Sequence, residues 1–207
     1  FAGPLQKIAA GFSAATGHTL KVAAGSTGKF YSQIIAGAPF EVLIAADDQT
    51  PKKLIAAGHA VAGSSFTYAI GKLVLWSAKP GLVDNRGAVL GSDRFAHLAI
   101  ANPKVAPYGA AALQVIKARG LADALAPKLV TGESIAQAFQ FVGTGNAELG
   151  FVALSQVAKR YYAGGRVMST AMLQQAFAEL TGQGRSLQQQ YLPRIQEQAR
   201  TLDLSKV

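Results

Sequence analysis

The fold of this chain is predicted most directly by AGSTGKFYSQIIAGAPFEVLIAADDQTPKKL at residues 24–54. A Gly-rich turn at 25–28 precedes a predicted helix over 30–35. The apolar run 41–46 is typical of a buried parallel strand, and a second helix is expected from residue 50, because Thr-Pro favours a helix start. Helices alternating with strands of these lengths indicate an α/β fold with mainly parallel sheets whose faces are covered.

The same alternation continues on both sides of this stretch. We predict helices over 5–16, 109–119 and 134–142, and strands over 18–24, 97–101, 129–131 and 148–154. Residues 66–77 are extended in character and are expected to cross between two lobes. A polar tail with a further helix follows residue 165.

Composition excludes several classes of protein. The 207 residues are 50% hydrophobic, which is enough to bury the core of one large domain or of two lobes. With no cysteine, neither disulfides nor thiolate metal sites are possible. The net charge of +9 comes from scattered residues without a nucleic-acid signature, so we expect a diffuse field that attracts anions and no nucleic-acid partner. The sequence shows neither a membrane-spanning apolar run nor a signal peptide.

The turn at Gly25–Lys29 is the first candidate binding site. It departs from the nucleotide-binding loop, which needs a glycine at position 23 and Ser or Thr at position 30. A turn of small residues at a helix start can still bind an anion through free N–H groups and the helix dipole, although a simple capped turn would have the same sequence. The segment from Asn102 to Gly109 predicts a second helix start of this kind, with Tyr108 near it.

Catalytic and metal sites are not expected. His18, His59 and His97 are isolated and lack metal-ligand spacing. Asp47 and Asp48 are adjacent, so on a strand they would point to opposite faces, which favours a capping or hinge role over acid–base chemistry.

Five stretches together resemble the molybdate-binding proteins of ABC importers, a family of bilobal periplasmic solute-binding proteins. They are AGPLQKIAAGFSAATGH at 2–18, the stretch at 24–54 quoted above, GSSFTYAIGKLVLWSAKPGLVD at 63–84, IANPKVAPYGAAA at 100–112 and ELGFVALSQV at 148–157. The resemblance implies a monomeric, non-enzymatic, periplasmic protein without a cofactor. It would deliver molybdate or tungstate to a membrane permease and its ATPase.

The resemblance also implies the site and the domains. The oxyanion-binding residues would be Ser26, Thr27, Tyr108 and Val152, with Tyr191 as a weaker candidate. Each of two α/β lobes would hold a mainly parallel sheet, joined by crossing strands. The expected lobes are 1–68 plus about 190–207, and 78–165, with a variable helical connection over 166–189.

Two alternatives stay open at the level of sequence. The family's first strand would precede residue 1 and its final helices would follow the tail, so the chain is also consistent with a truncated or diverged remnant that does not bind. An enzyme of similar fold is the other alternative, because a fold does not determine a function.

Overall fold

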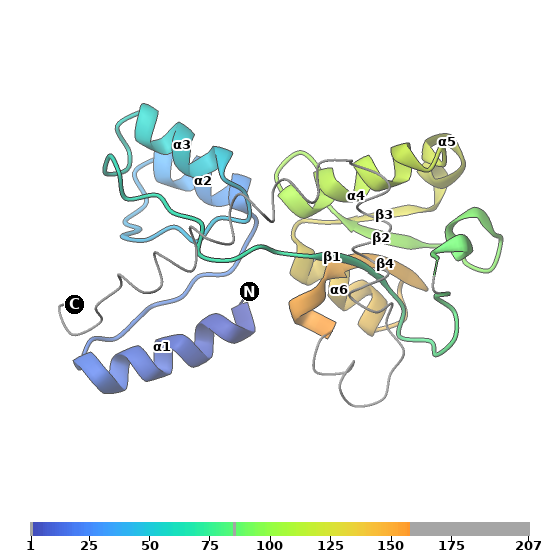
Figure 1. Ribbon diagram of the computed structural model, residues 1–207, viewed down its shortest axis with the longest axis horizontal. Coiled ribbons are helices and arrows are strands. Elements are labelled where there is room, and N and C mark those ends of the chain that lie inside the picture. Colours follow the sequence, from blue (N-terminus) through green and yellow to red (C-terminus); the bar gives the residue numbers. More distant parts are fainter. Residues whose placement is uncertain (1, 85, 158–207) are drawn as a thin grey trace.

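A computed structural model describes residues 2–84 and 86–157, which form two regions joined by one extended segment (Figure 1). We call residues 2–72 the helical region and residues 73–157 the sheet region. The helical region contains α1 (Ala2–Thr16), α2 (Thr27–Ile35) and α3 (Gln49–Ala56). These bounds confirm the three helices predicted there.

A four-stranded mixed sheet forms the centre of the sheet region. Its strands are β1 (Leu73–Trp76), β2 (Leu98–Ala101), β3 (Leu129–Gly132) and β4 (Leu149–Ala153), in the order β1-β4-β2-β3. Strand β2 is parallel to both β3 and β4, and only β1 is antiparallel to its neighbour β4. The apolar runs that predicted β2, β3 and β4 are therefore confirmed as strands of a mostly parallel sheet.

Helices cover both faces of this sheet. They are α4 (Pro107–Ala118), α5 (Ala122–Leu125) and α6 (Ile135–Gly143), with short 3₁₀ turns at η1 (Ala88–Gly91) and η2 (Ala126–Lys128). The two long helices α4 and α6 follow β2 and β3 directly, as expected when parallel strands are joined by helical crossovers. The helix predictions at 109–119 and 134–142 are confirmed.

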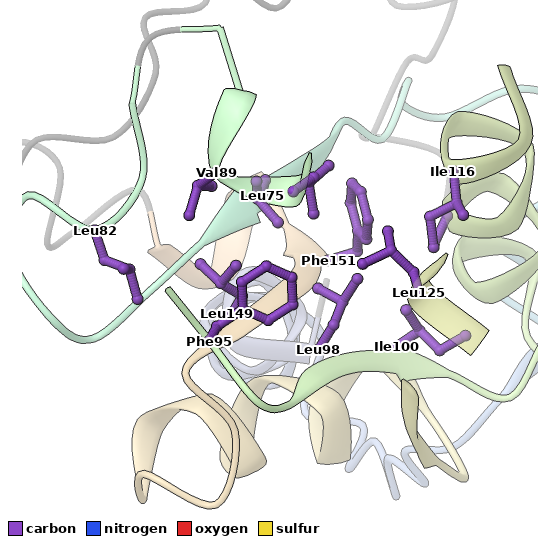
Figure 2. Packing of buried hydrophobic residues seen from close by; sticks show 12 residues of the cluster. Leu75, Leu82, Val89, Phe95, Leu98, Ile100, Ile116, Leu125, Leu149 and Phe151 are labelled. Carbon is purple, nitrogen blue, oxygen red and sulfur yellow. The ribbon is translucent and has the colours of Figure 1, made fainter. Parts of the chain in front are cut away.

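The core lies on both faces of the sheet because successive strand residues point in opposite directions. Leu98 and Ile100 of β2 pack with Phe151 of β4 beneath α4, in the cluster drawn in Figure 2. On the other face, the ring of Trp76 stacks on that of Phe139 from α6 at 5.1 Å between centroids. Burial of these apolar side chains is the main stabilising contribution to the sheet region.

The sheet expected in the first lobe is absent from the described part of the helical region. Residues 18–24 and 41–46 belong to no strand, so both strand predictions are wrong here. Most apolar side chains of these two segments are exposed, and Val42 retains 78% of its accessible surface. A strand is defined by pairing with a neighbouring backbone, and periodicity alone supplies no partner.

Within residues 2–84 and 86–157, no helix is long and apolar enough to cross a membrane. The predicted tail helix and the candidate residue Tyr191 lie outside the described residues.

Candidate anion-binding site

The start of α2 carries the first two predicted site residues. Ser26 is the N-cap, with extended backbone angles, and Thr27 is the first helical residue. Both are only 6% exposed, and they are the two buried polar residues of the described chain. The Thr27 hydroxyl oxygen accepts the N–H of Ala46 at 3.0 Å, which leaves its own O–H free to donate. The Ser26 hydroxyl makes no hydrogen bond to any described residue, so it is free to donate to a ligand.

The start of α4 carries the third predicted residue, Tyr108. The loop before it is turned by Asn102, whose carbonyl oxygen accepts the N–H of Ala106 at 2.8 Å. The next residue, Pro107, has no N–H, so the first backbone donor of α4 is that of Tyr108. This N–H has no partner among the described residues and points along the helix axis as an orphan donor.

The starts of α2 and α4 touch directly. The N–H of Gly28 donates to the carbonyl oxygen of Val105 at 2.9 Å. This bond joins the helical region to the sheet region and brings Ser26 and Thr27 close to the turn that precedes Tyr108. Two helix N-termini, each with positive partial charge, therefore lie side by side.

The start of α6 is a third helix terminus, which the sequence reasoning missed as a binding element. Because β2 and β3 are parallel neighbours, the helices that follow them begin at the same edge of the sheet, and Asn102 donates to the carbonyl oxygen of Gly132 at 2.7 Å. The Ser134 hydroxyl caps Gln137 at 3.4 Å, while the N–H groups of Ile135 and Ala136 have no partner among the described residues. The Ser-x-x-Gln pattern at 134–137 is the signal that could have identified it.

Val152 was expected among the oxyanion-binding residues, and it lies in the strand predicted over 148–154. In β4 it is completely buried and pairs with Val74. Leu154 donates to Lys72 at 2.9 Å, and hydrogen-bonded pairs alternate along an antiparallel ladder, so the N–H of Val152 is directed at β1. The Val152 N–H is therefore engaged in the sheet and is not a free donor for a ligand.

The candidate donors at these helix starts are neutral hydroxyl and backbone N–H groups. Lys29 is exposed on α2, and its side chain makes no hydrogen bond or ion pair with the described residues. Asp47 accepts from the N–H of Thr50 at 2.6 Å, and Asp48 pairs with Lys52, so both acids serve the start of α3, as the capping interpretation predicted. Burial raises the pKa of the Tyr108 hydroxyl, which keeps that side chain uncharged at neutral pH.

The described residues contain no group of His, Asp and Glu side chains that could hold a metal ion. His18, His59 and His97 are all exposed. The arrangement is therefore suited to bind an anion by hydrogen bonds and helix dipoles, without a countercharge.

Comparison with known proteins also supports an anion-binding protein. Residues 1–178 match the family described as "Bacterial extracellular solute-binding protein". The chain is 65% identical over 159 residues to "Molybdate-binding protein ModA" of Azotobacter vinelandii, covering 77% of this chain and 63% of that protein. It is 57% identical over 157 residues to the protein of the same name from Rhodobacter capsulatus, covering 76% and 62%. The chain thus spans less than two thirds of the length of these curated relatives.

Solved structures also resemble it. The periplasmic molybdate-binding protein of Azotobacter vinelandii superposes with a TM-score of 0.74 at 50% identity, over 75% of this chain and 68% of that one. The substrate-binding domain of a molybdenum ABC transporter from Clostridium difficile, described as putative, has a TM-score of 0.53 at 21% identity, over 88% and 89%. The second likeness concerns the fold alone.

Proposed function

The chain belongs to the bacterial extracellular solute-binding proteins, and on this premise we propose that it captures a tetrahedral oxyanion, molybdate or tungstate, between its two regions. In this proposal the helical and sheet regions act as the two lobes, and the end of the helical region, residues 64–72, leads directly into β1 of the sheet region. The protein performs no chemistry on the ligand. The molybdate-binding proteins to which it is similar support this choice of anion.

The observation that carries the proposal is the unpartnered hydroxyl of Ser26, a residue only 6% exposed at the N-cap of α2. This hydroxyl is free to donate to a ligand, and a hydrogen bond to a charged group contributes about 1.5–3 kcal/mol. Thr27 adds a second hydroxyl, and Tyr108 adds a backbone N–H from the other region. We assign the N–H groups of Ile135 and Ala136 to the same site, in the place where Val152 was expected to contribute.

Neutral donors fit the task of a carrier. A dianion must be held and then released, and a buried countercharge would carry a large desolvation cost whenever the site is empty. Donor-only chemistry also favours fully ionised molybdate over protonated phosphate, whose hydrogen requires an acceptor. Molybdate and tungstate are tetrahedral dianions of nearly equal size, so this set of donors should bind both of them.

We extend the proposal to the transport system. The chain would deliver the anion to a membrane permease and its ATPase from the periplasm, the compartment that the name of the similar Azotobacter vinelandii protein gives. The binding protein itself is expected to act as a monomer.

Calorimetric titration tests the proposal. The chain should bind molybdate and tungstate at one site and bind sulfate and phosphate much more weakly. Ser26→Ala should weaken molybdate binding by about 10- to 100-fold, because a hydrogen bond to a charged group contributes about 1.5–3 kcal/mol. Ser32→Ala is the matched control, since Ser32 is exposed on the same helix and bonds only to the carbonyl oxygen of Gly28. No heat of binding with any of the four anions would refute the proposal.

A further inference from the structure

The contact between the two regions depends on a glycine. Gly28, the second residue of α2, donates to the carbonyl oxygen of Val105 at 2.9 Å. A Cβ atom built on Gly28 would lie 2.8 Å from that oxygen, 3.0 Å from the Cα and 3.2 Å from the Cβ of Val105. Ordinary van der Waals contacts start at about 3.5 Å, so no side chain fits at this position.

The atoms that exclude a side chain at Gly28 belong to the backbone. Val105 is held by its own N–H, which donates to Asn102 at 3.2 Å, and the next residue, Ala106, donates to the same carbonyl at 2.8 Å. The turn is further fixed by Gly109, where a Cβ would overlap the carbonyl group of Ala101 at the end of β2. The start of α4 is therefore fixed on the sheet, so a side chain at position 28 would displace α2 and not α4.

Gly71 provides a useful contrast. A Cβ at Gly71 would also meet the start of α4, but the atom it would overlap is the hydroxyl oxygen at the tip of the Tyr108 side chain. A side-chain tip can rotate aside at little cost, whereas the carbonyl of Val105 cannot.

We propose that Gly28 is a positioning residue that sets how closely the starts of α2 and α4 approach, and thereby allows both to contact one small anion at the same time. This inference rests on the proposed oxyanion function. A side chain at position 28 would hold the two helix starts apart by a fraction of an ångström to about 1 Å. This displacement is enough to lose hydrogen bonds to the anion, because a hydrogen bond weakens steeply as the donor–acceptor distance grows. The effect should grow with the size of the side chain.

The experiment measures the distance between the regions and the affinity separately. The chain contains no cysteine, so spin labels can be attached to Lys53→Cys on α3 and Gln114→Cys on α4, both exposed, and followed by pulsed electron paramagnetic resonance. Gly28→Ala and then Gly28→Val should shift the distance distribution progressively to longer values, with and without molybdate. Affinity for molybdate should fall at least about fivefold in Gly28→Ala.

Three controls make the outcome decisive. Gly143→Ala, in α6 with open space around it, should change neither distance nor affinity, and Gly71→Ala should change them little. Thermal melts report whether Gly28→Ala is folded, and Gly28→Ser provides a second small substitution if it is not. Unchanged distances and affinity in folded Gly28→Ala would overturn the inference. If the unsubstituted chain binds no molybdate, the proposed function fails, while the distances still decide the role of Gly28.

Discussion

The hydroxyl oxygen of Thr27 accepts a hydrogen bond from the backbone N–H of Ala46 at 3.0 Å. This bond joins the first residue of α2 to the end of residues 41–46, which precede α3. The same hydroxyl retains its proton for donation to a ligand. One side chain is thus both a structural acceptor and a candidate binding donor.

Substitution of Thr27 separates these roles. Thr27→Val keeps the shape but removes both hydrogen bonds, so it should lower the free energy of unfolding by about 1 kcal/mol and weaken molybdate binding about tenfold. Thr27→Ser keeps the hydroxyl, so it should retain most of the free energy of unfolding and most of the affinity for molybdate. Urea denaturation and calorimetric titration measure them. A Thr27→Val chain with full affinity would remove Thr27 from the site.

Val152 should behave as a core residue. It is completely buried beside Val142 and Val74, so Val152→Ala should lower the free energy of unfolding by about 2 kcal/mol, through lost apolar contact and a cavity. Affinity for molybdate should remain within about twofold under conditions where the variant is folded. A large loss of affinity without a loss of stability would restore the binding role first expected from the sequence.

Lys29 is exposed at the start of α2, so its charge should steer anions without touching the bound one. Lys29→Ala should lower the association rate constant about twofold at low ionic strength, and the difference should vanish as salt is raised. Stopped-flow measurements at several salt concentrations test this. Lys117→Ala, which removes an exposed charge from the last turn of α4, is the control. A changed dissociation rate constant in Lys29→Ala would indicate direct contact instead.

Glu148 should make stability depend on pH. Its carboxylate accepts the N–H groups of His97 at 2.9 Å and Ala96 at 3.2 Å. The bond from His97 is the largest cause that lowers the pKa of Glu148 below its ordinary value of 4.5, against the opposing effect of burial. Because the pKa is lower in the folded state, the stabilisation is complete above about pH 5 and is lost as the pH falls through the folded value.

Glu148→Gln should therefore reduce the free energy of unfolding by about 1 kcal/mol at pH 7 and by less at pH 3. Denaturant titrations across this range measure the difference. Glu133→Gln, an exposed carboxylate at the edge of β3, is the matched control. A constant difference between parent and Glu148→Gln at all pH values would show that its charge is not involved.

Local elements of this protein followed from its sequence by itself. Small residues at 25–28 predicted the start of α2, the segment 102–109 predicted the start of α4, and apolar runs predicted β2 and β4. These predictions succeeded because helix capping, proline geometry and hydrophobic periodicity act over a few neighbouring residues. Ser26 and Thr27 could be selected as candidate donors for the same reason.

Other features were decided only by tertiary structure. Residues 18–24 have the periodicity of a strand but no paired neighbour among the described residues, and Val152, expected to bind the oxyanion, is buried within β4 and pairs with β1. The starts of α4 and α6 share an edge because β2 and β3 pair in parallel, and Gly28 meets the carbonyl of Val105 from the other region. Such relationships depend on which segments, far apart in the sequence, pack against one another. Local sequence patterns extend over a few residues and do not specify these long-range contacts.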